Sequence, residues 1–97
     1  MPKYVVLVNW TEQGIASAKD TVQRAEAFRA MARSMGGDTG ELLWTLGRYD
    51  LVGFLEAPDD ETAAAISMKV SGLGSVRTET LRAFTADEVS GIIGKLG

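Results

Sequence analysis

The residues of this chain most suited to chemistry are Gly47, Arg48, Tyr49 and Asp50, which lie in succession between two apolar runs. A tyrosine is a weak acid with an ordinary pKa of about 10. A neighbouring arginine lowers that pKa and a carboxylate can orient the hydroxyl group, so the group could donate a proton or hold a ligand oxygen. The same residues also suit a hairpin turn, because glycine accepts a positive φ and aspartate bonds nearby backbone amides. We favour the turn and keep both interpretations.

A second polar group follows at residues 77–82. If this segment is a strand, Arg77 and Glu79 share one face while Thr78 and Thr80 lie on the other. Charges on both faces are typical of an edge strand that avoids pairing with other chains. The alternative is a polar wall in an otherwise apolar ligand pocket. The candidate ligand-binding residues are Asn9, Trp10, Trp44, Gly47, Tyr49, Asp50, Arg77 and Thr80.

Several kinds of chemistry are excluded by residue types that the chain lacks. It has no cysteine and no histidine, so disulfides, the usual zinc sites, histidine-ligated haem and a Ser-His-Asp triad cannot form. The acidic run Asp59, Asp60 and Glu61 follows Pro58, where helix capping is a better explanation than Mg²⁺ binding. We therefore expect no metal and no cofactor.

Charge and hydropathy narrow the possible partners. The net charge is −3, and the lysines and arginines are scattered, which disfavours nucleic acid as a partner. No apolar run approaches the ~20 residues that a membrane span needs, and Asn9 ends the first run too early for a signal peptide. We expect a cytoplasmic protein with no membrane partner.

The hydrophobic periodicity predicts a single domain over residues 1–97, with alternating strands and helices. Asp20, with Gln23 as a capping partner, should begin the first long helix, and Gly36 should follow its end. Asp59 should cap the second helix, and a capping box that begins at Thr85 should start the last one. A short helical turn or ordered loop is expected at 15–19. The predicted strands are 4–10, 42–46, 51–57 and 75–84, and the predicted helices are 21–35, the segment from Asp59 to Gly72, and the segment after Thr85.

This order is βαββαβ with a C-terminal helix, which is typical of an α+β, ferredoxin-like fold with a four-stranded antiparallel sheet. The first strand is apolar on both faces, and two helices cannot hide Trp10, Trp44 and Phe54 together. The second face therefore needs a cover. We expect a second copy, which would form a dimeric α+β barrel; the alternative is that the C-terminal helix folds back over the face.

The chain resembles the GYD domain family, which comprises small bacterial and archaeal proteins of unknown function. The segments "YVVLVNWTEQG", "RAEAFR", "LLWTLGRYD", "EAPDDETAAA" and "SVRTETLRAFT" carry the resemblance over nearly the whole chain. It implies a ferredoxin-like, dimeric α+β barrel and supplies no reaction. Arg48 separates Gly47 from Tyr49 where the family name suggests Gly-Tyr-Asp, so only Gly47, Tyr49 and Asp50 match the motif.

Three hypotheses about function follow. The first is an oligomeric module, a homodimer or larger assembly of this chain, that binds a small and partly aromatic or acidic molecule between apolar walls. The second is a cofactor-independent enzyme, an oxygenase or isomerase, in which Tyr49 or Asp50 transfers a proton inside the barrel cavity. The third is an assembly unit whose cavity is filled by side chains.

Overall fold

The computed structural model describes all 97 residues as a sequence of four strands and four α-helices with one 3₁₀ turn. This confirms the α+β class and the predicted order of the long elements. The elements are β1 (Lys3–Trp10), α1 (Glu12–Ala16), η1 (Ala18–Asp20), α2 (Thr21–Ser34), β2 (Asp38–Trp44), β3 (Leu51–Glu56), α3 (Asp60–Gly72), β4 (Val76–Ala83) and α4 (Ala86–Gly94).

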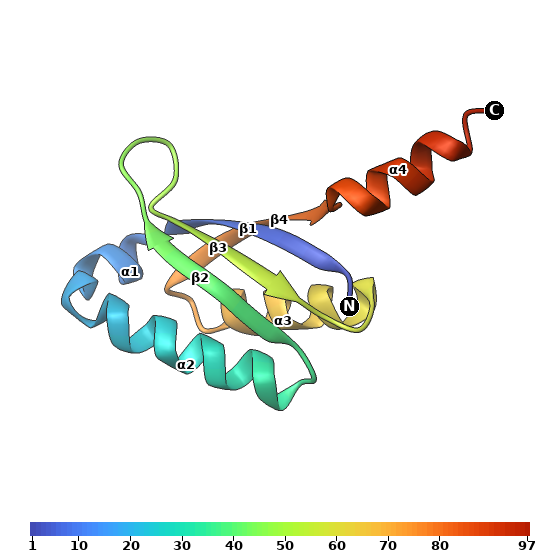
Figure 1. Ribbon diagram of the computed structural model, residues 1–97. Helices are drawn as coiled ribbons and strands as arrows, with labels where there is room; N and C mark the ends of the chain where they lie inside the picture. The colour runs from blue at the N-terminus through green and yellow to red at the C-terminus, as the bar shows by residue number, and fades with distance from the viewer.

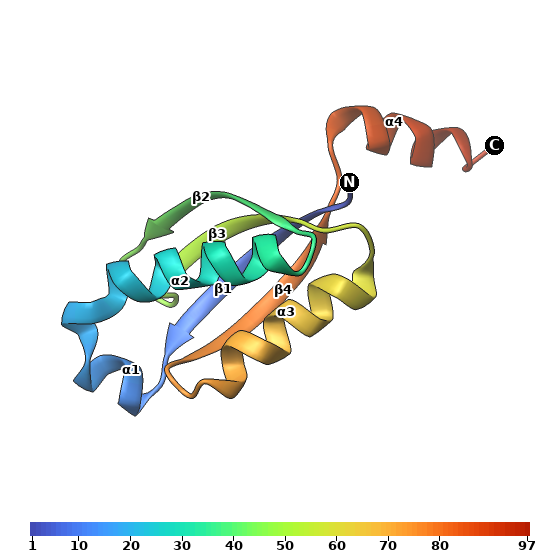
Figure 2. The ribbon, with the colours of Figure 1, turned by 90° about the horizontal axis from the view of Figure 1, so that it is seen from below.

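The four strands form one open antiparallel sheet in the order β2-β3-β1-β4, as in a ferredoxin-like fold. Helices α2 and α3 lie side by side against one face of this sheet (Figure 1, Figure 2). The opposite face carries no helix, and we call it the open face. The protein thus has one layer of helices and one sheet, and the open face of β1 is not covered by a further layer of its own chain.

The core lies between the sheet and the two helices. Along β1 the buried side chains are Tyr4, Val6 and Val8, which alternate with half-buried neighbours because successive side chains of a strand point to opposite faces. On the helix side the most buried residues are Ala32 of α2 and Ile66 of α3, both with no exposed surface. The strand alternation therefore identifies which face of β1 is the core face.

Two of the three predicted helix starts are made by side-chain caps. The Asp59 carboxylate accepts from the backbone amide of Thr62 at 2.7 Å, and Thr85 and Glu88 form the predicted capping box. The predicted Asp20 cap was wrong, because the Asp20 side chain makes no capping bond. Asp20 ends the 3₁₀ turn with a near-helical backbone (φ −95°, ψ 6°), so its carboxylate does not take the position that an extended N-cap residue provides.

The hairpin between β2 and β3 is longer than predicted. β2 ends at Trp44 rather than at residue 46, and the connection to Leu51 rises from the sheet as a loop on the open-face side (Figure 1). We call residues 45–50 the raised loop. The two ends of the raised loop are joined by a hydrogen bond in which the Thr45 amide donates to the Asp50 carbonyl at 3.0 Å.

Helix α4 extends away from the body of the molecule (Figure 1). The alternative in which this helix folds back over the open face is therefore wrong for the single chain. The radius of gyration is 14.6 Å, whereas a compact chain of 97 residues has a radius of about 12.5 Å. None of the helices is both long enough and apolar enough to cross a membrane.

Candidate functional site

The open face is apolar across its centre. Val5 of β1 lies between Phe54 of β3 and Leu81 of β4, because the three residues are aligned in the ladder. Phe54 and Leu81 are 45% and 46% exposed. Large contiguous apolar surfaces are typical of interaction sites. The apolar residues of the open face are Val5, Leu7, Leu43, Val52, Phe54 and Leu81.

The raised loop borders one end of this face, and β1 holds it in place. The Asp50 amide donates to the Val8 carbonyl, and the Asp50 carboxylate accepts from the Trp10 amide, both at 2.9 Å. Gly47 has a φ of +108°, which a side chain would disfavour. The turn interpretation therefore accounts for Gly47 and Asp50, since both residues serve the backbone of the loop.

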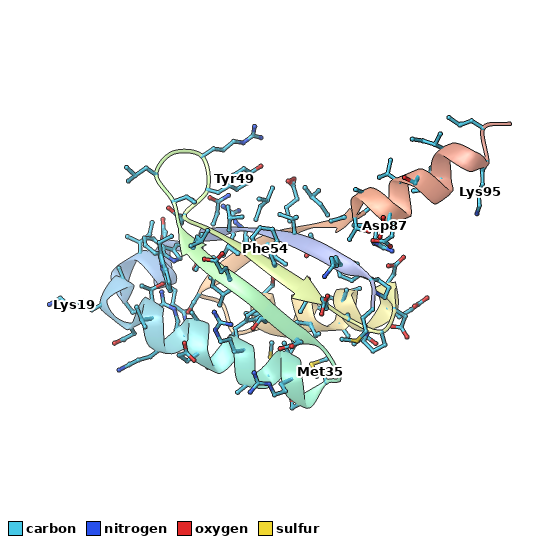
Figure 3. The ribbon with its side chains drawn as sticks, viewed as in Figure 1. Lys19, Met35, Tyr49, Phe54, Asp87 and Lys95 are labelled. Atoms are coloured by element: carbon cyan, nitrogen blue, oxygen red, sulfur yellow. The ribbon has the colours of Figure 1, made fainter.

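Tyr49 reaches from the raised loop toward the open face (Figure 3). Its hydroxyl group lies 3.5 Å from the Glu79 carboxylate, at the outer limit of a hydrogen bond, and the Arg48 guanidinium lies 5.7 Å from its ring centre. On the same face Asn9 of β1 is aligned with Arg77 of β4. We call the set Asn9, Tyr49, Arg77 and Glu79 the polar corner. It offers a phenol, an amide, a cation and a carboxylate beside an apolar patch.

The other three candidate residues lie on the helix side of the sheet. The Trp44 indole N–H donates to the Thr21 hydroxyl of α2 at 3.0 Å, and the Thr80 hydroxyl lies 2.8 Å from that of Ser67. Trp10 lines a cavity between the helices and the sheet. Among the candidates that lie in strands, Asn9 and Arg77 are thus separated from Trp10, Trp44 and Thr80, because residues of opposite parity on a strand point to opposite faces.

Glu79 belongs to the polar corner but was absent from the candidate residues. Glu79 follows Arg77 by two residues, a spacing that predicts that both lie on one face of a strand. The register of β4 on β1 confirms this shared face. The apolar residues Leu43 and Leu81 were missed as well. Only their alignment with β1 and β3 shows that they continue the same surface.

The junction between β4 and α4 lies at the far end of the sheet, and its central residue is Arg82, which is aligned with Tyr4 on the helix side. Its guanidinium lies 3.4 Å from the Glu88 carboxylate, 4.0 Å from that of Asp60 and 4.5 Å from the ring centre of Phe84. The pKa of Glu88 is lowered, mainly by the backbone amide of Thr85 and further by Arg82. These contacts lie at the point where α4 leaves the sheet, and we call them the elbow.

Beneath the elbow, Tyr4 is only 4% exposed and donates a hydrogen bond to the Asp60 carboxylate at 2.5 Å. Burial, together with this bond to a carboxylate, raises the pKa of Tyr4 to about 12. The acidic residues at 59–61 are therefore structural, as the capping interpretation predicts: Asp59 caps α3 and Asp60 accepts from Tyr4.

Helix α4 presents an apolar stripe to solvent. Its members are spaced as one face of a helix, and they are between 40% and 81% exposed. A helix that carries such a stripe is expected to bury it against another surface, because helical stability in proteins comes mainly from packing. The stripe consists of Val89, Ile92, Ile93 and Leu96.

Comparisons with known proteins agree with this fold. Over 84 residues the chain is 32% identical to the glutamine synthetase and cystathionine beta-lyase binding protein of Thermus thermophilus, in an alignment that covers 86% of this chain and 88% of that protein. The crystal structure of TTHA0845 from Thermus thermophilus superposes with a TM-score of 0.58 at 26% identity, over 89% of this chain and 96% of that one. The model of the GYD domain matches residues 4–93. The chain therefore belongs to the GYD domain family.

Proposed function

We propose that this protein is a binding module that works as a homodimer, in which two copies pack open face to open face. The observation that carries the proposal is the apolar patch on the open face, centred on Val5, Phe54 and Leu81. Burial of such a patch is favourable by roughly 25 cal/mol for each Å² of apolar surface. A second copy is a self-complementary cover, as in other two-fold symmetric dimers.

The exposed area of the single chain supports a second copy on the open face. The chain exposes 6259 Å², whereas a folded monomer of 10.4 kDa exposes about 5,400 Å². The excess is close to the ~800 Å² that each partner buries in a protein interface of standard size. The excess exposed area of the protomer therefore supports the proposed dimer.

Helix α4 and the raised loop stand at opposite ends of the open face and rise on the same side (Figure 1). In a face-to-face dimer both would reach past the edge of the partner's sheet. The apolar stripe of α4 would then be buried by the partner, while the contacts of Arg82 with Glu88 and Phe84 lie at the base of the helix. Two sheets that meet in this way form the α+β barrel expected from the sequence.

The barrel would enclose a chamber for a small molecule with the polar corner in its wall. Asn9, Tyr49 and Arg77 are the residues we propose as ligand contacts there, with Gly47 and Asp50 shaping the loop that carries Tyr49. Apolar surface with a few convergent polar groups is the usual composition of such sites. Trp10, Trp44 and Thr80 lie behind the sheet and would not line this chamber.

Protein partners are the second part of the proposal. The Thermus thermophilus relative is named for binding glutamine synthetase and cystathionine beta-lyase, and it aligns with 86% of this chain. We propose that the dimer binds metabolic enzymes of this kind. Purified glutamine synthetase and cystathionine beta-lyase from the same organism as this protein are the partners to test, by calorimetric titration against the dimer. If neither enzyme gives a heat of binding, the proposal of enzyme partners is wrong. The proposal that the protein forms a homodimer is tested separately.

Sedimentation velocity tests the dimer. At about 10 µM the protein should sediment as a dimer, and Leu81→Arg should weaken association by about 100-fold because it puts an unpaired charge at the centre of the interface. Met68→Arg is the matched control: Met68 is 75% exposed on α3, away from the open face. A wild-type monomer at this concentration, or equal effects of the two variants, would overturn the proposal.

A further inference from the structure

A cavity of about 230 Å³ lies on the other side of the sheet, between the inner faces of α2 and α3 and strands β1, β3 and β4. Its wall contains Val8 of β1, Phe28 and Met31 of α2, and Val70 of α3, and 13 of the 18 lining residues are hydrophobic. Protein interiors have few voids larger than a water molecule. The cavity is partly open to solvent, and at about 230 Å³ it is larger than the gaps that packed side chains normally leave between a sheet and its helices.

The apolar wall indicates an apolar occupant. An apolar cavity of roughly 150 Å³ stays dry and takes up benzene, because water finds no hydrogen-bond partners in it. The present cavity is larger than that and could hold a benzene ring with a short chain, or an alkyl chain of similar volume. The lining does contain a few polar residues, namely Thr21, Arg24, Ser75 and Thr78.

Arg24 is the charged group of this lining, and its contacts hold it in place without neutralising it. Its guanidinium donates to the Ser17 carbonyl at 2.6 Å, to the Ser17 hydroxyl at 3.0 Å and to the Gly14 carbonyl at 3.2 Å. All three acceptors are uncharged. They occupy three of the five N–H donors of an arginine and leave two for another partner.

The other arginines of α2 differ from Arg24 in this respect. Arg29 lies 3.7 Å from the Glu26 carboxylate, and Arg33 lies 3.9 Å from that of Asp38. Arg24 forms no such ion pair, although it is half-buried. The arginine that lines the cavity is thus the one in this helix whose positive charge lacks a carboxylate.

We propose that the cavity binds a small carboxylic acid with a compact apolar body, such as a medium-chain fatty acid or a phenyl-substituted acid. The apolar body lies against Phe28, Met31 and Val70, and the carboxylate meets the free donors of Arg24. Arginine suits this role because its planar fork matches the geometry of a carboxylate. The site lies across the sheet from the proposed dimer interface and does not depend on it.

Calorimetric titration with octanoate and 3-phenylpropionate tests the site, with 1-octanol as the uncharged probe. Octanoate should bind at least about tenfold more tightly than octanol, because only octanoate can pair with Arg24. Arg24→Gln should remove this advantage and leave octanol binding unchanged, whereas Arg33→Gln should change neither. If Arg24→Gln fails to fold by circular dichroism, Arg24→Lys replaces it and should keep part of the advantage, since the charge remains.

A second pair of variants tests the location. Ala27 lines the exposed rim of the cavity on α2, so Ala27→Phe narrows its entrance and should weaken the binding of both octanoate and octanol by at least about tenfold. Ala30→Phe is the control, because Ala30 is exposed on α2 and does not line the cavity. The proposal is overturned if octanoate does not bind, if it has no advantage over octanol, or if Ala27→Phe and wild type bind alike. Leu81→Arg should bind octanoate normally, which separates this site from the dimer.

Discussion

The backbone amide of Trp10 donates a hydrogen bond to the Asp50 carboxylate, with 2.9 Å between N and Oδ2. This bond joins the end of β1 to the last residue of the raised loop. The Asp50 amide also donates to the Val8 carbonyl, so Asp50 extends the pairing of β1 beyond the first residue of β3. Asp50 is therefore an anchor of the loop, whereas the side chain of Tyr49 lies beside Glu79 in the polar corner.

Replacement of Asp50 by alanine should lower the free energy of unfolding by about 1–3 kcal/mol, because the half-buried Trp10 amide loses its acceptor. Asp50→Asn should recover most of the loss, since its amide oxygen can still accept. Urea unfolding measures the difference. Asp87→Ala is the control, because Asp87 is exposed in the first turn of α4. Equal losses for Asp50→Ala and Asp87→Ala would show that the bond carries no stability.

Helix α4 should contribute to association and little to the stability of its own chain. Ile92→Asp places a charge in the apolar stripe and should weaken the dimer, because a charge in the core of an interface is desolvated. Ser90→Asp adds the same charge beside the stripe and should have a smaller effect. Sedimentation velocity gives the association constants, and urea unfolding of the monomeric Leu81→Arg background gives the protomer stability. A loss of protomer stability with Ile92→Asp would contradict this assignment.

Alkaline pH should destabilise the fold through Tyr4. The folded pKa of about 12 lies above the ordinary value of 10.0, so the folded state retains a proton that the unfolded state releases. The stabilisation from this group is complete below pH 10 and is lost as the pH rises toward 12. Tyr4→Phe should remove this dependence. Absorbance at 295 nm should show a titration step near pH 12 that disappears in Tyr4→Phe, and a step that persists would contradict the assignment.

Two glycines should respond to alanine in opposite ways. A Cβ atom at Gly14 of α1 would lie 2.1 Å from the Ser75 carbonyl oxygen, so Gly14→Ala must displace the backbone and should cost about 1–3 kcal/mol. A Cβ atom at Gly91 of α4 meets nothing within 4 Å. Gly91→Ala should therefore stabilise α4 by up to about 1 kcal/mol. Thermal unfolding followed by circular dichroism measures the loss for Gly14→Ala, and the helix content of the folded protein reports the gain for Gly91→Ala. A tolerated Gly14→Ala would disprove the close contact.

Some residues of the candidate site were predictable and others were not. The shared face of Arg77 and Glu79 followed from their spacing alone. The positions of Asn9 and Trp10, one residue apart on a strand, likewise place them on opposite faces, although both were assigned to one mostly apolar pocket. The contact between Tyr49 and Glu79 joins residues 30 positions apart, and no local pattern specifies it.

The sequence by itself determined the order of the long elements, the caps at Asp59 and Thr85, and the doubly apolar character of β1. These features depend on periodicity and capping, which act within a few residues. The tertiary structure decided that Tyr49 meets Glu79, that α4 leaves the body, and that Arg24 lines a cavity. The physical reason is that strand register and the spacing of helices on a sheet arise from contacts between residues far apart in the chain, and each side chain takes its neighbours from that arrangement.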